Sequence, residues 1–218
     1  MSEALSVAAI EQLFTRKDGN YSFARWGRPI APIVFGVDDD TLGYLKDAIA
    51  QTVAVTGGTL AETDPEFGAN FMWFFCTDWD EIAAVPDLEK LVPDLQNLVA
   101  GLSEKNVNQH RMFIFDTHGA IKMCLLFTRM KGAIADMPVN FLATGEVLQS
   151  LLTWSEGAFS TQSPIAVIEE NGICIVKPNY AALVRAAYDP ILPPCALDAS
   201  HALRLFPRAE KLYREMMQ

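Results

Sequence analysis

Apolar residues recur at helical spacing in several stretches of the chain, with polar residues on the opposite side. This period predicts a helix wherever it is sustained for two turns or more. Pro207 lies inside the last such stretch and is expected to interrupt it, because proline lacks the N–H that a helix interior uses. The predicted helices cover residues 4–14, 37–58, 95–102, 138–155, 179–190 and 198–218.

Other stretches are almost continuously apolar or alternate in polarity, as strands do. The run "ANFMWFFCTD" (69–78) is aromatic and predicts a strand buried on both faces. The prolines in "RPIAPIVFGV" (28–37) favour an edge strand or the start of a strand, since proline cannot donate to a ladder. Residues 110–130 predict a hairpin that turns at 116–119, and residues 165–177 predict a second one that turns at Asn171-Gly172.

The order of these segments indicates an α+β fold with a mixed β-sheet and packed helices. A chain of 218 residues is long enough for one sizeable core, and no long linker divides it, so we expect a single domain. We expect a helical extension at 1–24, an α+β domain at 25–194 and a second helical extension at 195–218.

The formal net charge of −10 and the absence of a Lys/Arg stripe argue against nucleic acid as a partner. No apolar run approaches the roughly 18–20 residues that a membrane-spanning helix needs. The first residues, "MSEALSVAAIEQLF", carry an acid where a signal peptide is basic, and no long apolar region follows. We therefore expect a cytoplasmic protein without a membrane span.

Known catalytic and nucleotide-binding motifs, such as G-x-S-x-G, a P-loop and G-x-G-x-x-G, are not found in the chain. The four cysteines form no C-x-x-C pair, and three of them lie in apolar runs, as buried free thiols do. The three histidines are too dispersed to bind one ion together. The sequence therefore predicts no cofactor and no metal.

The stretch "FLATGEVLQSLLTWSEGAF" (141–159) has the spacing of the zinc helix H-E-x-x-H with both histidines missing. In that motif two imidazoles four residues apart bind one ion, and the adjacent Glu polarises a metal-bound water. Gly145 and Gln149 occupy the two ligand positions, and Glu146 occupies the catalytic one. Candidate catalytic residues are thus Glu146, Gln149 and Glu156, the last just beyond the expected helix end. The alternative interpretation of Glu146 is a buried structural group bonded to Gln149 or an arginine.

Several stretches resemble a bacterial zincin-like, metalloprotease-like domain family of unknown function, whose members are often described as lipoproteins. The likeness begins with "RWGRPI" (25–30), continues through Thr56-Gly57 and Ala69-Asn70, and ends with "ALVRAAYDPILPP" (182–194). In that family the core helix reads E-E-x-x-Q, followed by L-G-L and N-D. The resemblance spans most of 25–194 and implies a zincin-like fold.

This chain departs from the family pattern at the residues that matter for chemistry. Gly145 occupies the position of the family's first acidic residue, and Leu152 occupies the position of the glycine in L-G-L. Ser155-Glu156 replaces the N-D pair. The resemblance therefore implies a zinc helix whose metal function is lost or altered.

Three hypotheses follow for the function. The first is a non-catalytic zincin-like domain, without bound zinc, that binds a protein or peptide partner. The second is a hydrolase-like enzyme that uses Glu146 with Gln149 or Glu156. The third is a structural scaffold that forms a homo-oligomer through its terminal helices.

Overall fold

Two nearly continuous apolar runs form the central strands of a four-stranded sheet, β3 (Phe71–Cys76) and β5 (Ile121–Arg129). The strand order is β2-β3-β5-β4, with β2 (Pro32–Phe35) and β4 (Gln109–Phe115) at the edges. Strands β2, β3 and β5 are parallel, and β4 pairs with β5 in the antiparallel direction. The predicted mixed sheet, the 110–130 hairpin and the edge position of 32–35 are confirmed.

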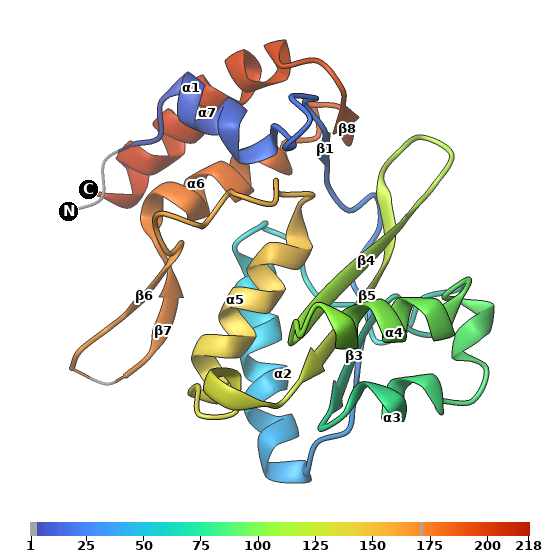
Figure 1. The fold of residues 1–218 in the computed structure, drawn as a ribbon. Helices are drawn as coiled ribbons and strands as arrows, with labels where there is room; N and C mark the ends of the chain where they lie inside the picture. The colour runs from blue at the N-terminus through green and yellow to red at the C-terminus, as the bar shows by residue number, and fades with distance from the viewer. Residues whose placement is uncertain (1–3, 171) are drawn as a thin grey trace.

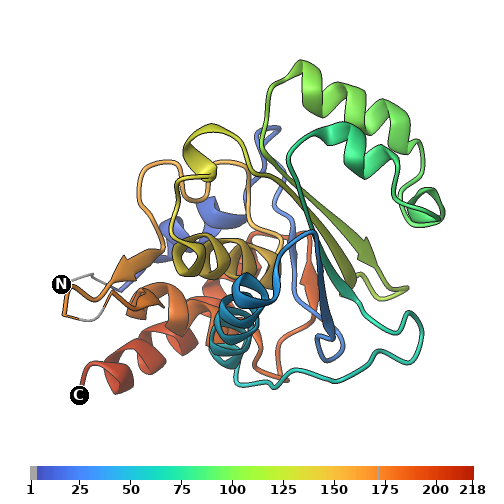
Figure 2. The ribbon, with the colours of Figure 1, turned by 90° about the horizontal axis from the view of Figure 1, so that it is seen from below.

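Each face of the sheet is covered by a different pair of helices (Figures 1 and 2). Helices α2 (Asp39–Ala54) and α5 (Val139–Leu151) lie on one face, over a core that includes Trp73. Helices α3 (Trp79–Ala83) and α4 (Leu95–Glu104) lie on the other, over Phe74 and its neighbours. Helices on both faces explain why β3 and β5 are apolar on both sides.

The structure is a computed structural model that describes residues 4–170 and 172–218, an α+β fold and a single compact body. Asn171 of the predicted turn lies outside this part, but the hairpin is present as β6 (Ile165–Val167) and β7 (Cys174–Val176). The remaining elements are α1 (Val7–Phe14), β1 (Phe23–Ala24), α6 (Pro178–Ala187), β8 (Cys195–Ala196), α7 (Ser200–Met216) and the short 3-10 helices η1 (Leu88–Lys90) and η2 (Gly132–Ile134).

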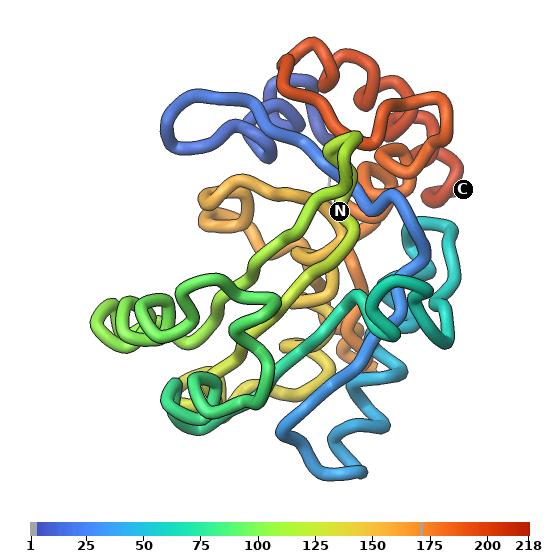
Figure 3. Tube along the Cα trace, turned by 90° about the vertical axis from the view of Figure 1, so that its right-hand side faces the viewer, coloured from blue at the N-terminus to red at the C-terminus, as the bar shows by residue number. Residues whose placement is uncertain are grey.

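The two terminal segments lie side by side at one end of the molecule (Figures 1 and 3). Strand β1 pairs with β8 in the antiparallel direction, and α7 packs against α1 and α6. The divisions at 24/25 and 194/195 stay predictions, since contacts between the terminal segments do not define domain boundaries.

The predicted interruption at Pro207 is wrong, because α7 continues through that residue. A proline in a helix removes the bond to the carbonyl four residues earlier, which here belongs to Leu203. Leu203 is 61% exposed, so its carbonyl lies on the side of the helix where water can replace the missing donor. The opposite side of α7 buries Leu205 and Ala209, and that packing stabilises the helix.

His201 is fully buried in the first turn of α7, where it joins the two terminal segments. Its Nδ1 lies 3.0 Å from the Tyr21 hydroxyl, its ring centroid lies 4.3 Å from that of Phe23, and its Nε2 has no partner among the described residues. Burial lowers the pKa of His201 to about 4, and the positive charge of Arg204 acts in the same direction. The folded protein therefore keeps this imidazole neutral.

His201 should make stability depend on pH between about 6.5, the ordinary histidine pKa, and about 4. In that window the unfolded chain binds a proton that the folded chain does not. Stability is therefore fully present above the unfolded pKa and is lost as the pH falls. We expect His201 to account for a loss of about 2 kcal/mol between pH 7 and pH 5, measured by urea denaturation. The loss should shrink in His201→Gln and persist in His118→Gln, whose side chain is exposed. An equal loss in both variants would contradict this assignment.

Candidate functional site

Gly145 and Gln149, at the two would-be ligand positions of α5, occupy packing positions. A Cβ atom at residue 145 would lie 3.1 Å from Cδ1 of Ile165 on β6, so this position has little room for a side chain. The Gln149 amide donates to the carbonyl of Gly145 at 3.3 Å, within the same helix. The β6–β7 hairpin thus packs on α5 where the first ligand of a zinc helix would project.

Glu146 points instead toward the edge strand β4 and is 3% exposed. Its Oε2 lies 2.6 Å from Nη2 of Arg111, and its Oε1 accepts a hydrogen bond from the Gln109 amide. Arg111 Nε donates to the Ser150 hydroxyl at 2.8 Å, and that hydroxyl donates to the Glu146 carbonyl at 2.7 Å. This polar network links α5 to β4 and uses both carboxylate oxygens.

The electrostatics of Glu146 are those of a buried, compensated acid. Burial raises the pKa of its carboxyl, and the charge of Arg111 and the hydrogen bonds from Arg111 and Gln109 oppose that rise. A buried carboxylate without its cation would be strongly destabilising, so Arg111 is required wherever Glu146 is ionised. The network is thus a structural connection in which both carboxylate oxygens have a partner on β4.

Glu156, the third sequence candidate, lies apart from this network. Its side chain is exposed in the segment after α5, and its Oε2 accepts a hydrogen bond of 3.3 Å from the backbone N–H of Lys17. The three candidates therefore have separate partners. Within residues 4–170 and 172–218, no three His, Cys, Asp or Glu side chains gather closely enough to hold a metal ion.

Sequence reasoning missed the two residues of β4 that hold Glu146, Gln109 and Arg111. They are two positions apart in a strand, so they face the same side of the sheet. A polar pair on one face of a largely apolar strand was the signal that could have identified them.

The void between α2, α5 and the sheet, lined by Val147 and Ser150 among others, is too narrow to admit a water molecule.

A second candidate region lies on the opposite face of the sheet, where aromatic rings form a row across all four strands. Phe35, Phe74, Phe127 and His110 are direct partners in the register β2-β3-β5-β4. Successive rings are stacked, with centroids 4.8, 5.3 and 6.3 Å apart. The row is buried at Phe127 and ends at Phe35, which is 41% exposed at the edge of the sheet.

Beside Phe35 the helical layer does not reach the edge of the sheet, which leaves an apolar groove of about 340 Å³. The groove is formed by β2, β3 and the segment between α3 and α4. We call it the β2 groove, and its lining residues are Phe35, Met72, Phe74, Val85, Pro86, Asp87, Leu88 and Leu91. Ile33, on the same face of β2, is 38% exposed. The apolar surface thus continues along an edge strand that has no strand partner on its outer side in the described residues.

Carboxylates gather at the end of β2 where Phe35 lies. Asp38, Asp39 and Asp40 follow directly, and Asp78 follows the parallel neighbour β3 at the same edge of the sheet. Asp38 caps α2 by accepting from the Thr41 N–H at 2.8 Å, and Asp87 in the groove pairs with Lys90. Four carboxylates therefore lie beyond this end of β2, and Asp87 is the acidic residue that lines the groove itself.

Comparisons with protein-family models, with curated proteins and with solved structures found no match for this chain. In the part of the chain that the structure describes, no helix is both long and apolar enough to cross a membrane. The structure therefore defines an α+β protein with a mixed sheet. Its two candidate regions are the Glu146 network on α5 and the β2 groove.

The Glu146–Arg111 pair can be tested by a double-mutant cycle. Arg111→Met leaves a buried carboxylate without its cation and should cost about 3–5 kcal/mol of unfolding free energy. The double variant Arg111→Met/Glu146→Leu removes both charges and should cost less than Arg111→Met alone. Urea denaturation at pH 7 measures the parent chain, the single variants Arg111→Met and Glu146→Leu, and the double variant. Glu156→Gln serves as an exposed control with little effect. Costs that add without coupling would contradict the pair.

Proposed function

We propose that this chain is a non-catalytic domain that binds a polypeptide partner in the β2 groove. The observation that carries the proposal is the row of stacked rings that ends at exposed Phe35, next to an open strand edge. Exposed apolar surface beside an unpaired edge is an arrangement that proteins use to bind an added strand. The partner strand would pair with the β2 backbone and place apolar side chains beside Phe35.

We also propose that the fold is zincin-like with its metal function lost. Support comes from the sequence resemblance together with the position of α5, which follows the central strand β5 and packs under the sheet. The packing of Ile165 against Gly145 further supports a helix that has exchanged a metal site for a packed contact. The domain that we propose binds its partner without zinc.

The charge around the groove favours a particular kind of partner. Asp38, Asp39, Asp40 and Asp78 surround the end of β2, in a chain whose net charge is −10. A segment with alternating apolar residues and flanking Lys or Arg complements this surface. A second copy of the chain carries the same net charge of −10, and like charges oppose that pairing. The partner we propose is therefore a different, basic polypeptide, and the homo-oligomer is the competing outcome.

The hydrolase-like alternative, with Glu146 acting beside Gln149 or Glu156, has less support. A general acid or base has to reach the substrate proton. Glu146 is buried, and both its oxygens are bonded to β4 residues. Gln149 and Glu156 have partners elsewhere. The second region therefore carries the function that we propose.

Selection from a random dodecapeptide library on the immobilised full chain tests the proposal. We expect the enriched peptides to alternate apolar residues and to carry flanking Lys or Arg. Their affinity, measured by fluorescence polarisation, should fall at least tenfold in Phe35→Asp, because a carboxylate replaces the terminal ring of the row. Exchange of their flanking basic residues for Glu should weaken binding similarly.

The matched control is Ile191→Asp, which changes another exposed apolar residue, 80% exposed and outside the groove. Binding should be unchanged in this variant. Failure to enrich any peptide, or equal binding to Phe35→Asp and the parent chain, would sink the proposal. Sedimentation that shows a dimer lost in Phe35→Asp would assign the groove to a second copy instead.

A further inference from the structure

Two adjoining cavities lie at the C-terminal end of α2, whereas the β2 groove lies near the N-terminal end of that helix. One, of about 410 Å³, lies between the ends of α2 and α6 and the helix α7. The other, of about 390 Å³, follows the segment 25–30. Thr56 and Tyr188 line both, so the two cavities are neighbours around the turn after α2, and we call the pair the basin. Their volumes are in the range of small-molecule sites.

The basin concentrates positive charge in an acidic protein. It is lined by five basic side chains and two carboxylates, Arg25, Arg28, Arg185, Arg208, Lys211, Asp189 and Glu215. The chain as a whole has 17 basic and 27 acidic residues, so this local excess of cations reverses the general balance. An excess of one charge in a cavity attracts ligands of the opposite sign.

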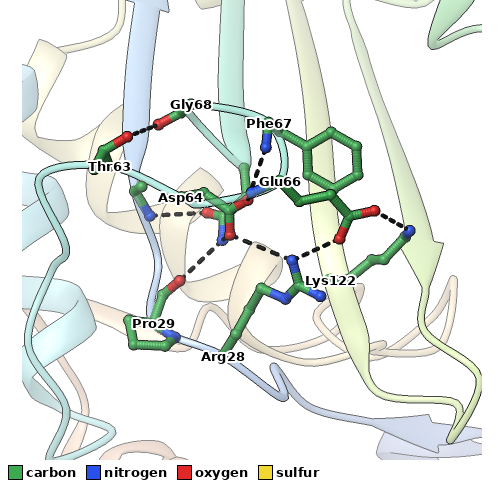
Figure 4. A network of polar contacts seen from close by, with 10 residues as sticks. Arg28, Pro29, Thr63, Asp64, Glu66, Phe67, Gly68 and Lys122 are labelled. Atoms are coloured by element: carbon green, nitrogen blue, oxygen red, sulfur yellow. Dashed lines mark hydrogen bonds and ion pairs between the residues drawn. The ribbon is translucent and has the colours of Figure 1, made fainter.

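Three of the basic residues are already compensated. Arg208 Nε lies 2.8 Å from Asp189 Oδ2, and Lys211 lies 3.8 Å from Glu215. Arg28 is paired with Asp64 and Glu66 at 3.4 and 2.9 Å, in the network at the start of β3 (Figure 4). The other two basic side chains of the basin are Arg25 and Arg185.

Arg185 and Arg25 form no ion pair with a carboxylate among the described residues, although the positive charge of Arg25 helps to lower the pKa of Asp189. Arg185 also makes no hydrogen bond there, and its guanidinium lies against Gly57, where a Cβ atom would overlap it. Arg25 donates to the carbonyls of Trp26 and Leu192 at 3.2 and 3.4 Å and stands 5.6 Å from the centre of the Tyr188 ring. Its buried Nε has no acceptor. A guanidinium has five N–H donors, so both side chains retain unused ones.

We infer that the basin binds a small organic or inorganic polyanion, with one oxyanion group on Arg185 and a second near Arg25. The planar guanidinium matches carboxylate and phosphate groups with two parallel hydrogen bonds. The C-terminal ends of α2 and α6, where the helix dipole is negative, account for the presence of cations here. They do not supply acceptors for the remaining guanidinium N–H groups. The basin shares no residue with the β2 groove, so this inference stands independently of the proposed function.

Isothermal titration calorimetry of the full chain with citrate and with pyrophosphate, in buffer of matched ionic strength, tests the site. We expect one ion per chain, and a heat change that sodium chloride does not produce. Binding of citrate alone identifies carboxylates as the ligand class, and binding of pyrophosphate alone identifies phosphates. Each of these results supports the basin as an oxyanion site.

Arg185→Gln should lower the affinity for the anion that binds at least tenfold, and Arg25→Gln should lower that affinity to a similar degree. Arg204→Gln is the matched control, because Arg204 is an exposed arginine of α7 outside the basin, and it should leave the affinity unchanged. Thermal melts of the three variants check that each is folded. Absence of binding by both anions, or equal weakening in all three variants, would overturn the inference.

Discussion

A sheet whose central strands are apolar on both sides has to be covered on both sides, and this requirement organises the molecule. Trp73 and Phe74 are adjacent in β3 and lie in the two different cores. Helices α2 and α5 pack on the first core, whereas the short α3 and α4 leave the second face open beside β2. The β2 groove is the part of the second face that this layer leaves open, and it exists because the layer is narrower than the sheet.

The packing of α5 between the sheet, α2 and the β6–β7 hairpin explains the surroundings of Glu146. A helix buried on nearly all sides has no place for an unpaired charge. Glu146 is therefore tolerated only because Arg111 and Gln109 reach it from β4. The same packing brings Ile165 against Gly145. In this structure α5 is a packed helix with one internal polar connection to β4.

Charged residues of opposite sign lie at the two ends of α2. Asp38, Asp39 and Asp40 lie at its N-terminal end, and the guanidinium of Arg185 lies at the turn that follows its C-terminal end. Both placements suit the direction of the helix dipole. They also give the molecule two surfaces of opposite sign, an acidic one beside the β2 groove and a basic one in the basin. The two binding proposals differ in partner for this electrostatic reason.

The sequence by itself determined the strands 71–76 and 121–129, the two hairpins and the helix that contains Glu146, because local periodicity and turn residues specify such elements. It also led to the α+β class with a mixed sheet. It did not reveal that Arg111 neutralises Glu146, that Pro207 lies inside a continuous helix, or that Arg25 and Arg185 share a basin. These features join residues distant in the chain or depend on which side of an element is buried. Only the tertiary structure decided them, since burial and charge pairing are set by the packing of whole elements and not by any local pattern.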